Sequence, residues 1–124
     1  LRPMVKAMRR GRVGYLMPDE DLGDDRSLFV PFFGVSTATL PVVGWLARLT
    51  AAAVLPVFIE FGESGQYKVA IHPPLDDFPS GDPHVDAAKV NAVFEAGIRE
   101  APEQTLWSLK WFRTRPAGEP SPYS

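Results

Sequence analysis

The alternation of apolar and polar residues along the chain predicts three helices. Residues 3–10 interleave apolar with basic residues, as an amphipathic helix does, and a glycine ends the pattern. Residues 38–50 follow a Ser-Thr pair that can cap a helix and are apolar almost all round. This helix is therefore either buried on two sides or partly in contact with lipid. Residues 85–101 carry the clearest apolar stripe at helical spacing, and a further short turn is expected from Pro102.

Three apolar stretches predict β-strands. Residues 13–17 form a short run that Pro18 ends, because proline has no N–H to give to a sheet. Residues 53–61 are rich in β-branched and aromatic residues, and Pro56 inside them favours an edge strand or a bulge. Residues 67–72 alternate apolar and polar after a Glu-Ser-Gly-Gln turn, so the last two strands are expected to form a hairpin.

The order of these elements predicts an α/β fold with a partial mixed sheet flanked by helices. A chain of 124 residues makes one domain at most. We place this domain at residues 1–116, followed by a tail at residues 117–124 that is rich in proline, glycine and serine. Three strands are few for two layers of helices, and the sequence starts within a helical pattern. The chain is therefore expected to be part of a longer protein.

An acidic stretch separates the first predicted strand from the apolar segment at residues 28–34. It holds five carboxylates within seven residues: Asp19, Glu20, Asp21, Asp24 and Asp25. Carboxylates this close repel one another, and a buried one needs partners, so the stretch is expected to line a cleft or to meet cations. Asp19 and Asp21 have the D-x-D spacing that can hold a divalent cation. The alternative is a solvated turn whose carboxylates cap local N–H groups.

Charge and composition narrow the classes of function. The formal net charge of −2 argues against nucleic-acid binding by bulk charge, and the absence of cysteine excludes disulfides, thiol nucleophiles and Cys-ligated zinc. No apolar run approaches the ~20 residues that span a bilayer. Basic residues that suit an anionic lipid surface, or that are simply solvated, crowd the two ends: Arg2, Lys6, Arg9, Arg10 and Arg12, then Lys110, Arg113 and Arg115.

His72 and Asp77 formally match a His-x-x-x-x-Asp pair, in which a carboxylate orients a histidine that acts as general base. Two prolines follow the histidine, and it ends a predicted hairpin strand rather than opening a tight turn into a helix. We therefore interpret His72 as a structural residue, and His84, beside Pro83, as a surface loop residue. Neither a glycine-rich phosphate loop nor the G-x-S-x-G motif of serine hydrolases occurs.

Several separate blocks of the sequence resemble the late acyltransferases of lipid A biosynthesis, the lauroyl/myristoyl family, which are similar to the wider glycerolipid acyltransferases. The resemblance covers nearly the whole chain, and its blocks follow in the family's order. These blocks are Met4-Val5-Lys6-Ala7, Pro18-Asp19-Glu20-Asp21-Leu22-Gly23, Phe29-Val30-Pro31-Phe32-Phe33-Gly34, Leu46-Ala47-Arg48, Val54-Leu55-Pro56-Val57, Ala101-Pro102-Glu103-Gln104, Leu106-Trp107 and Phe112-Arg113-Thr114-Arg115-Pro116.

The resemblance implies the C-terminal half of a glycerolipid-acyltransferase-like fold. By analogy with the wider group, Asp19, Asp21 and Arg26 are expected near the acceptor pocket as substrate-binding residues. Arg113 and Arg115 are expected to meet an anionic headgroup, because the planar guanidinium suits phosphate. The resemblance places the family's catalytic His-x-x-x-x-Glu before the first residue of this sequence. No catalytic residue is therefore expected within the chain, and these 124 residues are expected to be inactive alone.

The implied reaction of the parent enzyme is transfer of a fatty acyl chain from acyl-carrier protein to a hydroxyl of a lipid A precursor. The resemblance implies no cofactor, and it implies a location on the cytoplasmic face of the bacterial inner membrane. A variant of this hypothesis keeps the family and changes the acceptor, for example to a mannosylated phosphoinositide. Two hypotheses from other classes stay open. One is a non-catalytic module that binds anionic lipid, and the other is a metal-dependent transferase or phosphatase that uses Asp19 and Asp21.

Overall fold

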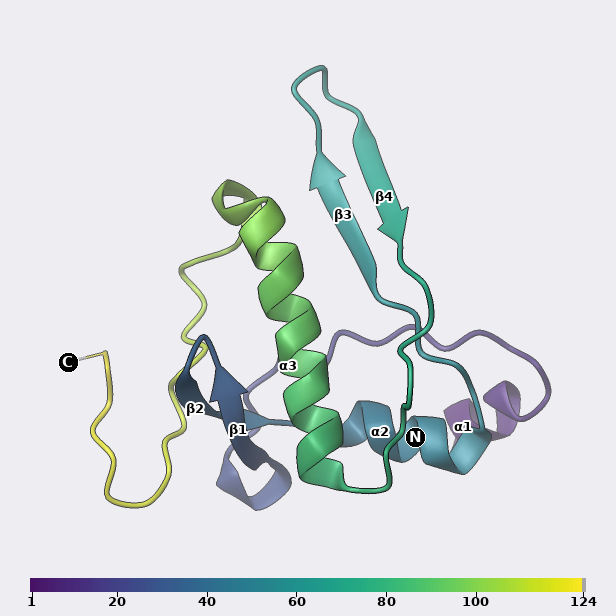
Figure 1. Cartoon of the computed structure of the whole chain (residues 1–124), viewed down its shortest axis with the longest axis horizontal. Coiled ribbons are helices and arrows are strands. Elements are labelled where there is room, and N and C mark those ends of the chain that lie inside the picture. Colours follow the sequence, from purple (N-terminus) through teal and green to yellow (C-terminus); the bar gives the residue numbers. More distant parts are fainter. Residues whose placement is uncertain (124) are drawn as a thin grey trace.

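The computed structural model describes residues 1–123 and combines helices with short antiparallel hairpins (Figure 1). The α/β class predicted from the sequence is confirmed, and the strands form two separate two-stranded sheets rather than one shared sheet. In chain order the elements are α1 (Arg2–Met8), the 3-10 turn η1 (Asp24–Arg26), β1 (Leu28–Phe32), β2 (Val35–Thr39), α2 (Val42–Thr50), β3 (Val57–Phe61), β4 (Tyr67–Ile71), α3 (Pro83–Glu100) and the 3-10 turn η2 (Pro102–Gln104).

The first hairpin joins β1 and β2 in antiparallel register from Leu28↔Thr39 to Phe32↔Val35. Its two-residue loop, Phe33-Gly34, has positive φ at both positions, 47° and 76°. Two consecutive left-handed residues are the geometry of the hairpin turns whose twist matches that of the strands. The loop therefore returns the chain onto β1 instead of starting a helix. The helix predicted over residues 38–50 is accordingly shorter, and its expected Ser-Thr cap lies in β2.

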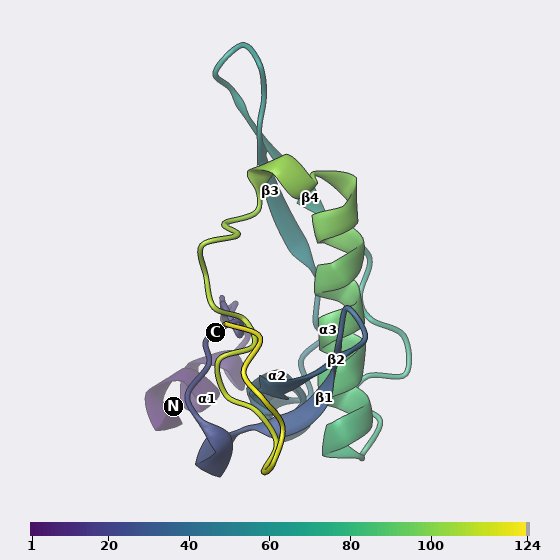
Figure 2. The ribbon, with the colours of Figure 1, turned by 90° about the vertical axis from the view of Figure 1, so that its left-hand side faces the viewer.

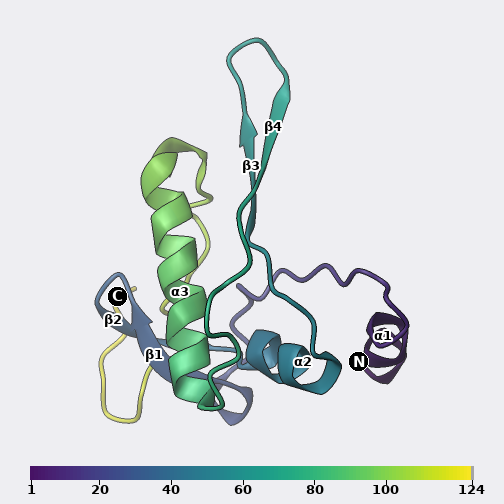
Figure 3. The same ribbon diagram turned by 45° about the vertical axis from the view of Figure 1, so that its right-hand side comes forward.

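The second hairpin joins β3 and β4 and confirms the predicted pairing of these strands. Its register runs from Val57↔Ile71 to Phe61↔Tyr67, and Pro56 lies directly before β3, where its carbonyl accepts a hydrogen bond from the N–H of His72 (2.9 Å). Because the proline lies outside the strand, every residue of β3 keeps a backbone N–H that can donate to the sheet. Viewed from the side, this hairpin projects beyond the other elements (Figure 3).

Helix α3 is the element on which the fold is assembled, lying between the two hairpins (Figure 1). Asn91 on α3 donates hydrogen bonds to the carbonyl of Pro31 (3.0 Å) and to Oγ1 of Thr39 (2.9 Å), and Glu95 accepts one from the N–H of Phe33 (2.7 Å). These bonds attach both strands of the first hairpin to one helix face. The buried apolar residues lie on β1, β2, α2 and α3: Val30, Phe32, Ala38, Val43, Leu46, Ala47, Ala87 and Val90.

Helix α3 begins earlier than predicted, at Pro83, because Asp82 caps it by accepting a hydrogen bond from the N–H of His84 (2.8 Å). His84 therefore lies exposed in the first turn of the helix, which corrects its assignment to a loop. Asp86, one turn further on, is buried and accepts a hydrogen bond from the N–H of Ser80 (2.7 Å). The two aspartates thus fix the entry into α3.

Residues 13–17 do not form a strand, so that prediction is wrong. They are part of an extended segment between α1 and η1, and Val13 is 97% exposed. A strand needs a neighbour to pair with its N–H and C=O groups. Among residues 1–123, β1 pairs with β2 and β3 pairs with β4, and no strand pairs with this segment.

The segment after η2 carries neither helix nor strand among the described residues and descends from the end of α3 to the first hairpin (Figure 2). Its aromatic residues pack on Phe32, whose ring centroid lies 5.3 Å from that of Trp111 and 6.1 Å from that of Phe112. This packing places the following Arg-Thr-Arg run beside the acidic stretch.

Candidate functional site

The acidic loop, residues 18–26, is attached to the C-terminal segment through Asp21. Oδ2 of Asp21 accepts a hydrogen bond from the N–H of Thr114 (2.9 Å), and its Oδ1 accepts one from the N–H of Gly23 (3.0 Å). Nη2 of Arg113 donates to the carbonyl of Asp21 (2.8 Å), and Nε of Arg113 lies 3.7 Å from Oδ2. We name these contacts the Asp21 clamp; those with Arg113 and Thr114 join residues more than 90 positions apart in the sequence.

The Asp21 carboxylate is ionised at neutral pH although its side chain is only 12% exposed. Burial raises the pKa of Asp21, but the Thr114 hydroxyl, the backbone N–H groups of Gly23 and Thr114, and the charge of Arg113 outweigh it. The net pKa of Asp21 therefore lies below its ordinary value of 3.8. The clamp is thus a partly buried, charge-assisted contact.

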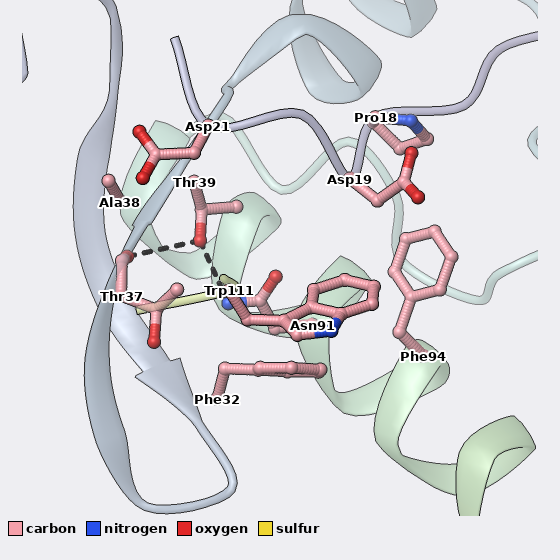
Figure 4. A pocket seen from close by; sticks show the side chains of 10 residues that line it. All are labelled: Pro18, Asp19, Asp21, Phe32, Thr37, Ala38, Thr39, Asn91, Phe94 and Trp111. Carbon is pink, nitrogen blue, oxygen red and sulfur yellow. Dashed lines mark hydrogen bonds between the residues drawn. The ribbon is translucent and has the colours of Figure 1, made fainter. Parts of the chain in front are cut away.

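Asp19 and Asp21 line the same small cavity, of about 30 Å³, which has room for a water molecule (Figure 4). Its floor is aromatic, formed by Phe32 and Trp111, and its back wall carries Thr39, hydrogen-bonded to Asn91. Nε1 of the Trp111 indole is buried and has no hydrogen-bond partner within residues 1–123. The acidic stretch therefore meets a concavity that mixes carboxylates, polar groups and aromatic rings.

The other predicted substrate-binding residues lie in different surroundings. Arg26, on η1, lines a second and much larger cavity, and Pro18 forms part of the wall of both cavities. Arg115 is engaged by its own chain, since its guanidinium donates to the carbonyl of Ser36 and to the carboxylate of Glu119. The structure thus brings Asp19, Asp21 and Arg113 together and leaves the two other arginines apart from them.

The arrangement around the acidic loop bears on the metal-site hypothesis. Both carboxylate oxygens of Asp21 already accept N–H groups, and the nearest cation is the guanidinium of Arg113. Nowhere in residues 1–123 do three or more histidine or carboxylate side chains gather in a way that could hold a metal ion. The D-x-D spacing therefore places two carboxylates on one cavity without forming a recognisable set of metal ligands.

His72 packs through its ring, which lies edge-on to Phe58 with the centroids 5.5 Å apart. Asp77 is exposed, and no hydrogen bond joins it to His72 in the described part of the chain.

Within residues 1–123, no helix combines the length and hydrophobicity needed to cross a bilayer.

Comparison with known proteins supplies the family. The sequence profile of the family "Bacterial lipid A biosynthesis acyltransferase" matches residues 1–114, which include the whole acidic loop and both partners in the Asp21 clamp. The chain belongs to this family. The resemblance inferred from the sequence blocks is thereby confirmed.

Relatives within the lipid A acyltransferase family are similar along almost the entire chain. A lipid A biosynthesis acyltransferase of Haemophilus influenzae is 41% identical over 120 residues, which are 96% of this chain and 37% of that protein. The lipid A biosynthesis myristoyltransferase of Escherichia coli is 38% identical over 99% of this chain and 38% of its own length, and the lauroyltransferase of the same organism is 38% identical over 99% and 41%. The chain therefore spans about two fifths of the length of these acyltransferases.

Some residues that organise this site escaped the sequence analysis. Thr114 was noticed within a family block, but its part in the clamp includes a backbone N–H, which sequence patterns do not report. Asn91 was overlooked because it lies on the apolar stripe of α3, and a polar residue on such a stripe is itself a signal of a buried hydrogen bond. The burial of Asp86, in the first turn of α3, was also missed.

Proposed function

We propose that this chain is the acceptor-side part of an enzyme that transfers a fatty acyl chain from acyl-carrier protein to a hydroxyl of a lipid A precursor. The Asp21 clamp is the observation that carries the proposal, because it unites two distant family blocks around one cavity. The relatives are named as acyltransferases, including a myristoyltransferase and a lauroyltransferase, which supports the reaction class.

In such a transfer the acceptor hydroxyl attacks the thioester carbonyl carbon, a general base takes the hydroxyl proton, and the thiolate leaves. We assign the base to a His-x-x-x-x-Glu pair outside these 124 residues, as the family resemblance implies. The role of this chain is orientation, which contributes to rate by fixing the attacking group. Asp19 is exposed at the cavity and accepts hydrogen bonds from the acceptor, and Asp21 is a positioning residue that holds the loop.

The same proposal places the enzyme on the cytoplasmic face of the bacterial inner membrane. Its support is the basic character of α1 and the residues after it, where Arg2, Arg10 and Arg12 are exposed. Each basic residue close to an anionic membrane surface contributes about 1 kcal/mol to attraction. Binding to vesicles that contain anionic lipid, weakened by salt, is the expected behaviour.

A chimaeric enzyme tests the proposal. The chain replaces the matched 38% of the Escherichia coli myristoyltransferase, and acyl transfer from acyl-carrier protein to a lipid A precursor is measured in isolated membranes. We expect the chimaera to be active and Asp19→Asn to lower its rate roughly 10- to 100-fold, since misplaced reactants cost factors of this size. Asp25→Asn, which changes an exposed carboxylate of the same loop outside the small cavity, is the matched control.

Membrane binding of the two chimaera variants separates the enzyme from the lipid-binding module. Lost transfer with unchanged membrane binding in Asp19→Asn supports an acceptor-side role. Equal rates in the Asp19→Asn and Asp25→Asn chimaeras, or full turnover by the 124 residues alone, would overturn the proposal.

A further inference from the structure

The second hairpin, which projects beyond the other elements, distributes its side chains in an unusual way (Figure 3). Its only two charged strand residues, Glu60 and Lys68, lie on one face and pair with each other (3.3 Å). The opposite face carries six apolar residues that are 41–72% exposed: Val57, Ile59, Phe61, Tyr67, Val69 and Ile71. An antiparallel hairpin that meets water usually turns polar residues toward it. A face without any polar side chain is instead typical of a surface that another element covers.

The edge of β3 that faces away from β4 has unpaired backbone groups. Residues along an antiparallel ladder alternate between those that exchange hydrogen bonds with the partner strand and those that point away from it. The bond from the N–H of His72 to the carbonyl of Pro56 (2.9 Å) fixes the phase of this alternation. The N–H and C=O groups of Val57 and Ile59 therefore point away from β4, and they have no hydrogen-bond partner within residues 1–123.

The next residue along this edge is already paired, and its partner is a side chain. The N–H of Phe61 donates to Oε1 of Gln104 (2.7 Å), and Nε2 of Gln104 donates to the carbonyl of Phe61 (3.1 Å). The primary amide thus supplies the acceptor and the donor that the backbone of a neighbouring strand would supply. The edge of β3 is therefore open at two residues and closed at the third.

The corresponding edge of β4 is less suited to pairing. The backbone groups that point away from β3 belong to Tyr67, Val69 and Ile71, and the next residue in the same phase is Pro73. A proline has no N–H to donate, and prolines at a sheet edge are one of the ways in which proteins prevent further pairing. Of the two edges of this hairpin, that of β3 is the one that can accept another strand.

We propose that the free edge of β3 binds an extended segment from the part of the acyltransferase that lies outside these 124 residues. The segment pairs with the backbone of Val57 and Ile59 and ends before Phe61, and apolar side chains from the same part of the enzyme cover the exposed face. The addition of a strand to a sheet edge is a recurrent mode of recognition, in which main-chain hydrogen bonds supply the affinity.

The relatives support this choice of occupant. The chain spans about two fifths of their length, so most of each relative lies outside the matched part and is available to cover the hairpin. The inference rests on membership of the family and on the geometry of the hairpin. It does not depend on the proposed reaction.

Hydrogen exchange tests the inference by comparing the 124-residue chain with the chimaera described above, purified in detergent, in which the Escherichia coli myristoyltransferase supplies the remainder. Mass spectrometry with residue-level fragmentation measures the amides. Those of Val57 and Ile59 are expected to exchange at least about 100-fold more slowly in the chimaera, because a neighbouring strand then accepts their N–H groups. The amide of Val69, which points away from β3, is the internal reference and is expected to change by less than about 10-fold.

A matched pair of proline variants tests the same edge by stability. Ile59→Pro removes only an N–H that points away from the hairpin ladder, and Val69→Pro does the same on β4. In the 124-residue chain the two variants are expected to lower the Tm equally. In the chimaera, Ile59→Pro is expected to lower the Tm by about 2 °C or more beyond Val69→Pro, because it alone removes a donor to the added strand. Where a proline variant does not fold, the exchange comparison of the unaltered proteins decides.

Three results would overturn the inference. The first is equal exchange of Val57 and Ile59 in the chain and in the chimaera, and the second is an equal loss of Tm for the two proline variants in the chimaera. The third is slow exchange at this edge in the 124-residue chain that increases with its concentration, which would assign the edge to a second copy of the chain.

The outcome is separable from that of the proposed function. An inactive chimaera with slowly exchanging edge amides contradicts the proposed function alone. An active chimaera whose edge amides exchange as fast as in the 124-residue chain contradicts this inference alone.

Discussion

The two hairpins have strands of equal length and similar apolar character, but they lie in different surroundings. Val30 and Phe32 of the first hairpin are each 4% exposed, covered by α3 and by the aromatic residues after η2. In the second hairpin, only one of the two faces packs against the rest of the described chain, through Phe58. The other face, which we name the outer face, carries six apolar residues that are 41–72% exposed: Val57, Ile59, Phe61, Tyr67, Val69 and Ile71.

The difference shows how unevenly this chain distributes its stability. The second hairpin approaches α3 through Phe58, and the contact depends on Gly97, where an added Cβ would lie 2.2 Å from the phenylalanine ring. Strand β3 presents Val57, Ile59 and Phe61 on the outer face and Phe58 and Glu60 on the opposite face. A contiguous apolar patch of this kind marks an interaction surface. The first hairpin therefore belongs to the core of the described chain, and the second is only half packed.

Truncating Phe32 is expected to give the largest effect. Phe32→Ala removes a buried ring from the packing with Trp111 and Phe112, and such changes cost about 3–5 kcal/mol. Ile59→Ala on the outer face is the control, with an expected change within about 0.5 kcal/mol in the free energy of unfolding by urea. Equal losses for the two variants would show that the outer face is packed in solution.

Breaking the Asp21 clamp is expected to have an intermediate effect that is confined to the half of the molecule with the first hairpin. Asp21→Asn loses the ion pair with Arg113 and weakens the contact with Thr114, at a cost of about 1–3 kcal/mol. Hydrogen exchange should quicken in residues 18–26 and 111–115 and stay unchanged in β3 and β4. Asp25→Asn, with its exposed carboxylate, should leave both regions unaltered.

The clamp also predicts a dependence of stability on pH. Burial raises the pKa of Asp21, but its hydrogen bonds and Arg113 outweigh that, so the folded pKa lies below the unfolded value of 3.8. The stabilisation is therefore fully present above the unfolded pKa and is lost as the pH falls through the folded pKa. Urea unfolding between pH 5 and about 2 should show a smaller loss of stability in Asp21→Asn than in the unaltered chain. Identical slopes would contradict an ionised clamp.

The smallest expected effect concerns the second hairpin. Gln104 of η2 holds the edge of β3, because its side-chain oxygen accepts from the N–H of Phe61 (2.7 Å) and its amide nitrogen donates to the carbonyl of Phe61 (3.1 Å). Gln104→Ala should cost about 1 kcal/mol and quicken exchange at Phe61. Glu103→Ala, at the exposed neighbouring position, should do neither. A large global loss would show that the second hairpin is part of the core after all.

The sequence predicted those elements whose signal is local. Helix α3 and the second hairpin were expected because the apolar stripe of the helix and the Glu-Ser-Gly-Gln turn of the hairpin lie within their own segments. The strand expected at residues 13–17 was wrong because an apolar run does not reveal whether a pairing partner exists. Strand β2 was merged with α2 because its return depends on Phe33, a bulky residue with positive φ that composition does not identify as a turn.

The candidate site was likewise predictable only in the part whose signal lies within one short segment. The acidic stretch was expected to line a cleft or to meet cations, and Asp19 and Asp21 do line one cavity. Their union with Arg113 and Thr114 depends on how the last segment folds back over β1, which is a long-range packing event. Whether these residues bind substrate stays a prediction for the chimaera to test.

Pro18 has a consequence for how the two cavities behave together. Its ring is a single partition with carboxylates on one side and hydrocarbon on the other. Since proline holds its backbone φ almost fixed, this partition is a stiff part of the acidic loop. A displacement of Pro18 would therefore change the shape of both cavities at once, because both are lined by the same residue.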